Sequence, residues 1–405
     1  MSSAINTVLR GTTAVVGIGQ TPFYKRGTSG QAALKLALQA IVSACEDAGI
    51  DPADIDGFVS YGSERNDGQR MMPALNTKEL RFGALVWTHG GGIPGALGLA
   101  ATAIVTGQAN VVAVYRAMSE TGGQRLRVAV AQDDTAAQQL VNGLDGPAQM
   151  CAMRSMRLIE AEGVPARTLR DMALASYYHA RRNPAAVGRG IELDESKYGS
   201  SRWISEPYRL FDCSRENDAG VACIMVSAQQ APHLRQPPAY LLGAPMGAAR
   251  GWGMLEENHN PYWSAGFQGV AKRLWAETGC RPGDVDVAQI YENMTGMGVS
   301  AMIEHGFCTL ENAAEFITFD NLIAPNGTLP INTSGGNLAE GFIHGMSLVN
   351  EAVRQIRAQS GSRSRAVADD RRPRRPRRVH RPVGQRRHPL IPPGADRTDH
   401  IASIL

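Results

Sequence analysis

Hydrophobic positions recur with a helical period between residues 29 and 49. The apolar side chains three or four positions apart share one face of a helix, and they are Leu34, Leu38, Ile41, Val42 and Cys45. Ser29 can cap the start of this helix, and Gly49 can end it, because glycine adopts the left-handed backbone that closes many helices. The pattern therefore predicts a helix that packs on a core by one face.

Other parts of the chain show apolar runs without alternation. Such runs are typical of strands that are covered on both faces, and they occupy residues 14–17, 58–61, 110–115, 222–226 and 240–244. Strands and helices that follow one another in this way predict an α/β protein built in layers.

One segment of the chain occurs twice, 230 residues apart. Residues 48–56 lead into the strand 58–61, and the similar residues 278–286 lead into 287–291. Gly49 matches Gly279, and Tyr61 matches Tyr291. A repeat on this scale indicates that the chain contains two related halves.

Each half continues into a glycine-rich turn and a long predicted helix. The first turn, 88–92, precedes a helix over 93–107, and the second, 333–337, precedes a helix over 338–357. We therefore predict an N-terminal half at 1–230 and a C-terminal half at 231–358. Residues 117–205 interrupt the first half with mainly helical sequence that is rich in Arg and Met, which predicts an inserted loop domain.

The composition is that of an ordinary globular protein, with 43% hydrophobic and 20% charged residues. A run of about 18 apolar residues, as a membrane helix needs, is absent, and residues 1–20 have no continuous apolar region of a secretory signal. We therefore expect a cytoplasmic protein that does not bind membranes. The six cysteines are widely spaced and form no C-x-x-C pair, so we expect no metal site; they are Cys45, Cys151, Cys213, Cys223, Cys280 and Cys308.

The C-terminal segment 359–405 differs from the rest in composition. Its last 45 residues contain twelve Arg and four Asp, with no Lys or Glu, so the remaining chain is net negative and nucleic-acid binding is not expected. Arg and Pro in this density form neither a core nor a regular helix. Three explanations stay open: a shifted reading frame, a basic tail that binds an acidic partner, or divergent folded sequence.

Three local patterns resemble the thiolase superfamily over residues 12–357. They are the opening strand 14–22, the phrase Asp212-Cys213-Ser214 with Asp218 beyond it, and residues 329–338. Within the superfamily they are most similar to a branch labelled lipid-transfer proteins or acetyl-CoA acetyltransferases, which includes aldolases that shorten steroid side chains. The resemblance implies two duplicated α/β halves that form a layered αβαβα core.

The same resemblance implies where the site lies in the first half. Thiolases present a nucleophilic cysteine at the first glycine-rich turn, where this chain has His89, Gly90 and Gly91. A side chain that could attack is missing there. The N–H groups at Gly90 and Gly91 could still hold a thioester oxygen at the helix start, with His89 lining the site.

In the second half, Tyr291-Glu292-Asn293-Met294 corresponds to the thiolase Asn-Glu-Ala-Phe motif, and Gly341-Phe342-Ile343 to its Gly-His-Pro motif. Tyr291 thus replaces the asparagine and Phe342 replaces the histidine, while His344 stands two residues on. The aldolases of the branch commonly have tyrosine where this chain has Phe342. Gly335 and Gly336 would let the backbone approach the substrate closely.

These replacements exclude thiolysis, which needs a thiolate nucleophile. They permit retro-aldol cleavage of a β-hydroxyacyl-CoA to a ketone and a shortened acyl-CoA, without an acyl-enzyme and without a further cofactor. We expect Tyr291 to transfer the proton with His344 as its partner. The alternatives are a catalytically silent subunit that binds acyl-CoA or a partner, and an acyl-CoA acyltransferase. The resemblance also implies a homodimer that can work with a small OB-fold, zinc-ribbon (DUF35) subunit.

Overall fold

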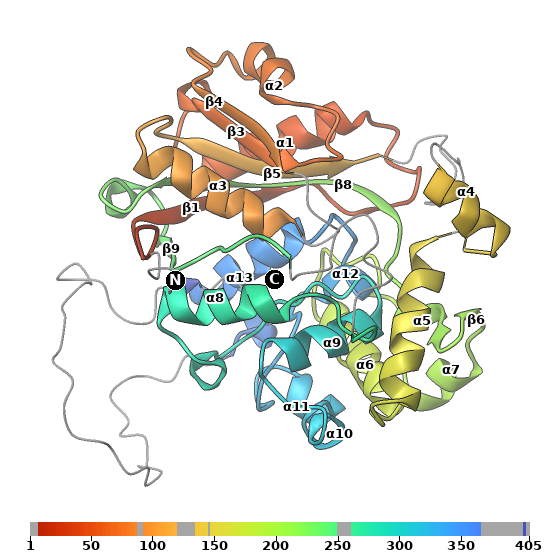
Figure 1. Cartoon of the computed structure of the whole chain (residues 1–405). Helices are drawn as coiled ribbons and strands as arrows, with labels where there is room; N and C mark the ends of the chain where they lie inside the picture. The colour runs from red at the N-terminus through yellow and green to blue at the C-terminus, as the bar shows by residue number, and fades with distance from the viewer. Residues whose placement is uncertain are drawn as a thin grey trace, which may run out of the picture.

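The computed structural model describes residues 7–86, 92–119, 134–144, 146–248, 261–365 and 400–401. Within these residues the core is an eight-stranded mixed sheet with the order β10-β9-β1-β8-β5-β3-β4, and β2 pairs with β8 beside this path (Figure 1). The strands are β1 (Thr13–Gln20), β2 (Tyr24–Lys25), β3 (Gly57–Tyr61), β4 (Phe82–Val86), β5 (Val112–Met118), β8 (Asn217–Ser227), β9 (Ala239–Leu241) and β10 (His400–Ile401).

Strand direction divides the sheet into two parts. Strand β3 runs parallel to both β4 and β5, whereas β8 runs antiparallel to both β1 and β5. The parallel strands β3 and β5 therefore bring their carboxyl ends to the same edge of the sheet, where Tyr61 and Arg116 lie.

Helix α1 (Ala33–Ala48) covers one face of the sheet, and α2 (Gly68–Leu75) lies beside it (Figure 1). The buried side chains Leu36 and Ile41 of α1 pack on Phe58 and Ile224 of the strands. Gly17 and Gly19 allow this approach, because a Cβ at either position would lie about 2 Å from a carbonyl oxygen of α1. The Gly-x-Gly pair in β1 thus serves helix packing.

Helices α3 (Ile93–Val105) and α13 (Met346–Ile356) cover the other face. Leu97 of α3 and Val353 of α13 belong to one core cluster with Val59 and Val112 of the sheet. These two helices form a layer between the sheet and the remaining helices of the second half (Figure 1).

Most of the remaining helices, among them α5, α6, α9, α10 and α11, lie below this layer, whereas α4 lies to the side near the level of the sheet (Figure 1). Leu169 and Met172, from the segment predicted as an insertion, share a core cluster with Ile290 and Met302 of the second half. The described part of that segment therefore packs into the core of the second half. Its elements and those of the second half are α4 (Asp134–Val141), α5 (Pro147–Glu160), α6 (Arg167–Arg181), α7 (Glu195–Ser200), the hairpin β6 (Trp203–Ser205) and β7 (Tyr208–Arg209), α8 (Gln268–Thr278), α9 (Thr295–Glu304), α10 (Ala313–Phe316), α11 (Phe319–Leu322) and α12 (Gly336–Ala339).

The repeat is visible in the backbone. Gly49 and Gly279 both end a helix in the left-handed region, with φ of 74° and 69°. A short 3₁₀ turn follows each of them, at Pro52–Asp54 and at Pro282–Asp284. These matching turns confirm that the two segments are related in structure.

The two copies differ at the strand that follows. Strand β3 has partners on both sides, whereas residues 287–291 make a single parallel bridge, Ala288 to Ile331, and form no strand among the described residues. The side chain of Asn332 takes the place of a neighbouring strand here, since it bonds the backbone N–H and C=O of Ile290 over 2.6 and 2.9 Å. The predicted strand is therefore wrong as a regular element, because its ladder has too few partners.

Two further predictions about helices are wrong. Helix α1 begins after Ala32 and has no side-chain cap, while the hydroxyl oxygen of Ser29 accepts from the backbone of Gln31. The helix predicted over 338–357 is divided into α12 and α13 by a loop in which His344 and Gly345 have φ of 48° and 83°. Two successive left-handed residues cannot continue a right-handed helix.

The fold extends beyond residue 358. Arg363 is buried and pairs with the buried Glu351 over 2.9 Å, and β10 adds His400–Ile401 beside β9. Residues 366–399 and 402–405 of the predicted tail lie outside the described residues, so its three explanations stay open. No helix in the described parts of the chain is long and apolar enough to cross a membrane.

Candidate functional site

The site begins at the carboxyl ends of β3 and β5. Ser60 pairs with Tyr115 in the parallel ladder, which places Tyr61 beside Arg116 on the neighbouring strand. The guanidinium of Arg116 lies 5.8 Å from the centre of the Tyr61 ring. Val112 and Val114 belong to the core cluster on the α3 and α13 side of the sheet. Because strand side chains alternate, Arg116 shares that side.

The second half contributes three ring side chains to the same place. The ring of Phe342 lies 6.3 Å from that of Tyr291 and 4.8 Å from that of His344. His344 in turn stacks on Tyr61 of the first half, with ring centres 4.5 Å apart and planes 26° apart. Tyr61, Tyr291, Phe342 and His344 therefore form one aromatic cluster where the two halves meet.

His344 lies in the loop between α12 and α13. Arg116 Nε donates a hydrogen bond to Nδ1 of His344 over 3.2 Å. Burial, and second the positive charge of Arg116, lower the pKa of His344 to about 3. The imidazole is therefore neutral at physiological pH.

Arg116 is itself held by a buried carboxylate. Its NH1 group donates to Glu64 Oε2 and to the carbonyl oxygen of Ala117, both over 2.8 Å, and its NH2 group donates to Ser63 Oγ over 3.1 Å. A buried ion pair needs such additional hydrogen bonds to offset desolvation of the charges. Arg116 is therefore a fixed charge at the edge of the aromatic cluster.

Tyr291 carries a proton in this environment. Burial raises the pKa of Tyr291 well above its usual value of 10, and Tyr61, Cys151 and Glu292 add to the effect, while Arg116 opposes it. Burial also raises the pKa of Tyr61. The hydroxyl of Tyr291 is thus a donor at neutral pH, and the depressed pKa that a tyrosine base would need is not found.

The cysteine thiols of the described core stay protonated. Cys151 influences Tyr291 electrostatically, yet burial raises the pKa of its thiol to about 12. The pKa of Cys213 is raised to about 12 as well, by burial and by Asp212. A thiol with such a pKa is a poor nucleophile, because the thiolate is the reactive form.

The second glycine-rich turn surrounds Glu292. A Cβ at Gly336, which has φ of 59°, would lie 1.9 Å from Glu292 Oε1. The carboxyl oxygens of Glu292 accept from the side chain of Asn337 over 3.1 Å and from the backbone of Leu338 over 3.5 Å. Gly335, with φ of 108°, lies against Ala180. These contacts account for both glycines without a ligand, so their role in substrate binding stays a prediction.

Three predicted site residues, His89, Gly90 and Gly91, lie outside the described residues. The described chain resumes at Gly92, and helix α3 begins at Ile93. Their predicted contact with a thioester oxygen stays a prediction. In the described ranges, no group of three or more His, Cys, Asp or Glu side chains could hold a metal ion.

Two members of the site were not predicted. Tyr61 could have been found from the repeat, since it is the counterpart of Tyr291 in the first half. The sequence gives a weaker indication for Arg116, which is a charged residue directly after the apolar run 110–115. Neither signal shows that the two halves face each other at this point.

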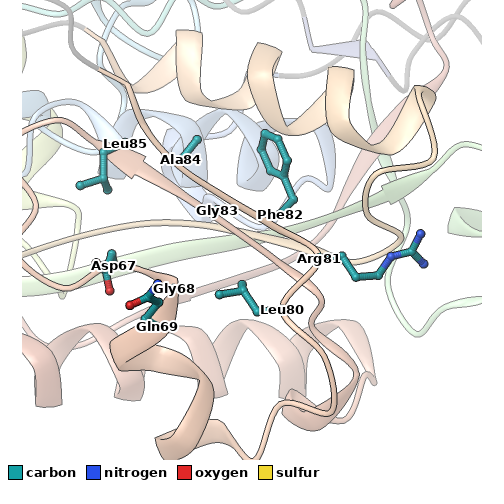
Figure 2. A pocket seen from close by; sticks show the side chains of 9 residues that line it. All are labelled: Asp67, Gly68, Gln69, Leu80, Arg81, Phe82, Gly83, Ala84 and Leu85. Carbon is teal, nitrogen blue, oxygen red and sulfur yellow. The ribbon is translucent and has the colours of Figure 1, made fainter.

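A pocket of about 420 Å³ lies elsewhere, at the outer edge of the sheet (Figure 2). Residues Leu80–Leu85 of β4 and its approach line one side, and Asp67, Gly68 and Gln69 at the start of α2 line the other. No residue of the aromatic cluster takes part in it. This pocket is therefore a feature of the sheet edge and not of the candidate active site.

Comparison with known proteins identifies the family. Residues 251–372 match the family model described as Thiolase C-terminal domain-like. The chain is 35% identical to the 17-hydroxy-3-oxo-4-pregnene-20-carboxyl-CoA lyase of Mycobacterium tuberculosis, over 87% of this chain and 93% of that protein. It is 36% identical to the steroid side-chain-cleaving aldolase of Thermomonospora curvata, over 87% of this chain and 92% of that protein. The chain belongs to the thiolase superfamily, in its steroid side-chain aldolase branch.

The solved structures agree with this assignment. The Ltp2–ChsH2(DUF35) aldolase is similar with a TM-score of 0.82 and 34% identity, over 88% of this chain and 93% of that one. The predicted thiolase-like α/β fold and the resemblance to the aldolase branch are therefore confirmed. The aromatic cluster contains one residue from each of the two second-half motifs, Tyr291 and Phe342.

Proposed function

We propose that this protein cleaves a β-hydroxyacyl-CoA by a retro-aldol reaction, giving a ketone and a shortened acyl-CoA. The observation that carries the proposal is the aromatic cluster, in which two buried tyrosines and a neutral histidine meet where the two halves of the chain face each other. Such a site offers hydrogen-bond donors to a developing thioester enolate but no nucleophile. The names of the relatives support a steroid side chain as the acyl group.

Tyr291 transfers the proton in this proposal without becoming charged. Its oxygen accepts the proton of the β-hydroxyl while its own proton passes to Cα of the leaving acyl-CoA. The O–H electron pair becomes the second bond of the ketone, and the electron pair of the Cα–Cβ bond becomes the new C–H bond. The raised pKa of Tyr291 is compatible with this relay, whereas a free phenolate base would be costly to form.

The relay suits a substrate whose β-carbon carries a tertiary hydroxyl. Such an alcohol cannot be oxidised to the β-ketone on which thiolysis depends, so bond cleavage must start from the alcohol itself. The reaction moves only protons and electron pairs, and it requires no redox cofactor.

Tyr291→Phe tests the assignment. The phenyl ring fills the same space, so we expect a folded protein whose kcat for a tertiary β-hydroxyacyl-CoA falls by about 10²- to 10⁴-fold, the usual contribution of a proton-transfer group. Tyr178→Phe, on α6 and outside the cluster, is the matched control. Full activity of Tyr291→Phe would exclude the relay.

The silent-subunit alternative is favoured by one observation, the phenyl ring of Phe342. With phenylalanine at position 342, the cluster lacks the tyrosine hydroxyl that the aldolases commonly have at this position. Phe342→Tyr separates the two functions. If the protein is an aldolase, the variant should cleave its substrate faster than wild type. If the protein only binds acyl-CoA, the variant should still show no turnover. The acyltransferase alternative loses support, because the thiols near the cluster are protonated.

A small DUF35 subunit is the proposed partner. The support is the similar solved structure, the Ltp2–ChsH2(DUF35) aldolase, whose name joins an aldolase to a DUF35 protein. Assays with and without such a subunit, together with co-elution in size-exclusion chromatography, test the assembly. Equal activity and separate elution would count against it.

We further propose that the protein forms a homodimer by pairing β4 with β4 of a second copy. Strand β4 is the last in the sheet order, and no described strand pairs with its outer edge. Leu85 on this strand is 41% exposed, and the pocket of Figure 2 runs along it. An open apolar edge is a template for another strand.

Leu85→Lys tests the dimer, because it places like charges close together across a two-fold axis. We expect the mass in sedimentation to fall from that of a dimer to that of a monomer. Val141→Lys, an exposed apolar residue on α4, is the control and should leave the mass unchanged. An unchanged mass in Leu85→Lys would place the interface elsewhere.

A further inference from the structure

We infer that Arg116 fixes His344 in the tautomer that is protonated at Nε2, so that His344 acts as a hydrogen-bond donor to the thioester oxygen and not as a base. Arg116 is in this sense a positioning residue, because it acts through His344. The role toward the thioester rests on the proposed function, whereas the tautomer can be measured independently of it.

The hydrogen bond between the two side chains determines the tautomer. Arg116 Nε lies 3.2 Å from Nδ1 of His344. A guanidinium has only donors and does not lose its proton in proteins, so Nδ1 must be the acceptor. A neutral imidazole has one acceptor and one donor nitrogen, which places the proton of His344 on Nε2.

Arg116 cannot easily turn away from this contact. Glu64 Oε2 accepts from Arg116 NH1 and also from the backbone N–H of Ala117, over 2.8 and 2.9 Å. Glu64 Oε1 accepts from the side chain and the backbone of Asn66, over 2.9 and 3.1 Å. The carboxylate is thus bonded at both oxygens within the loop that follows β3, and it holds the guanidinium at the end of β5.

The imidazole ring is also held from its sides. Tyr61 stacks on one face at 4.5 Å, and Phe342 lies 4.8 Å away at an angle of 55°. The left-handed backbone at His344 and Gly345 directs the loop between α12 and α13 into this position. The ring therefore has a defined plane, and the bond from Arg116 selects which nitrogen carries the proton.

The charges around His344 favour the neutral ring. Arg116 is the charged group in contact with His344, and Glu64 lies behind it as the partner of Arg116. The other titratable groups of the cluster are Tyr61 and Tyr291, which burial keeps protonated. No carboxylate contacts the imidazole directly among the described residues. A neutral imidazole that donates from Nε2 can polarise a thioester carbonyl, as neutral histidines do in other enzymes.

This inference changes the part predicted for His344. As the partner of Tyr291 it was expected to help remove a proton, which would need a free acceptor nitrogen. Nδ1 is occupied by Arg116 and Nε2 carries the proton, so neither nitrogen is free. His344 and Tyr291 are then both donors, which matches the needs of a thioester enolate that gains negative charge.

The tautomer is tested by ¹⁵N NMR of the full-length protein labelled at histidine, with the His344 signals assigned by their loss in His344→Gln. We expect Nδ1 to behave as an acceptor nitrogen and Nε2 as a protonated one, unchanged as the pH is lowered from about 8 to 5.5. A proton on Nδ1, or a doubly protonated ring at neutral pH, would overturn the inference. This measurement stands even if the protein cleaves no acyl-CoA.

Variants of Arg116 test its positioning role. In Arg116→Met we expect a mixture of both His344 tautomers in the NMR experiment, because burial still keeps the ring neutral, and we expect kcat to fall about tenfold or more with little change in KM. Arg116→Lys keeps a donor and a charge and should retain the fixed tautomer in part. If Arg116 were merely structural, His344 would keep its proton on Nε2 in Arg116→Met, which would also contradict the inference.

Arg116→Met leaves Glu64 as an unpaired buried charge, so this variant could unfold. The double variant Arg116→Met, Glu64→Gln removes both charges and keeps the test available. If wild type is inactive while the NMR result is as expected, the proposed function fails and the tautomer assignment holds. If wild type is active and the tautomer is the other one, only the inference about Arg116 fails.

Discussion

Glu292 makes the stability of this protein depend on pH in an unusual direction. Its carboxyl group is completely buried beneath the turn at Gly336. Burial raises the pKa of Glu292 from 4.5 to about 8, although hydrogen bonds from Leu338, Asn332 and Asn337 oppose the shift. At neutral pH the folded protein therefore keeps a proton that the unfolded chain has lost.

The sign and size of the effect follow from linkage. Between about pH 4.5 and 8 the folded state binds more protons than the unfolded state, so stability falls as the pH rises through this window. One pKa unit corresponds to about 1.4 kcal/mol, so the raised pKa of Glu292 corresponds to roughly 3 to 5 kcal/mol of stability. Glu340, whose pKa burial raises to about 7, contributes in the same direction.

Glu292→Gln removes this contribution while it keeps the size of the side chain. We expect the difference in the free energy of unfolding between about pH 5 and 8.5 to shrink by several kcal/mol relative to wild type, measured by urea unfolding across that range. The control is Glu79→Gln, which removes one charge at an exposed position. Parallel pH curves for wild type and Glu292→Gln would refute a buried, protonated Glu292.

Three other predictions follow from particular contacts. Gly336→Ala should lower the free energy of unfolding by about 2 kcal/mol or more, because φ is 59° and the new Cβ would lie 1.9 Å from Glu292 Oε1. A lower melting temperature would show this loss, and Gly83→Ala, with open space around its Cβ, is the control. Since the pKa of His344 is about 3, kcat for cleavage should stay constant from about pH 7 down to 5.5, and an inflection near the ordinary histidine value of about 6.5 would contradict this. Tyr198→Phe removes the hydroxyl that donates to both oxygens of buried Asp212 over 2.9 and 2.8 Å, so the free energy of unfolding in urea should fall by about 1 to 3 kcal/mol; an unchanged value would mean that Asp212 is satisfied without it.

Local sequence patterns were sufficient to predict most of the regular secondary structure in the first half of the chain. The apolar runs led to β1, β3, β5 and β8, because strands that are covered on both faces need apolar side chains at every position. The helix over 33–48 and its end at Gly49 could be predicted for the same kind of reason, since the periodic face and the left-handed cap are both local. The repeat was also visible, because it consists of similar residues at a constant spacing.

The errors occurred where distant contacts determine the backbone. Residues 287–291 have the composition of a strand, yet a strand needs neighbours, and the side chain of Asn332 replaces one of them here. The helix predicted over 338–357 is interrupted at His344 and Gly345, where the chain turns toward Tyr61 and Arg116. No periodicity within the segment could show that interruption, because the contacts that stabilise it come from the first half.

By itself, the sequence determined the α/β class, the duplication, the family resemblance and the loss of the thiolase nucleophile. Each of these depends on residue types at short or regular spacings. The tertiary structure decided that Tyr61 joins Tyr291, that Arg116 holds His344, and that Glu292 occupies the donors of the second glycine-rich turn. The physical reason is that protonation states and hydrogen-bond partners depend on burial and on neighbouring charges. Here the groups that face each other come from distant parts of the chain, since Arg116 and His344 are 228 residues apart.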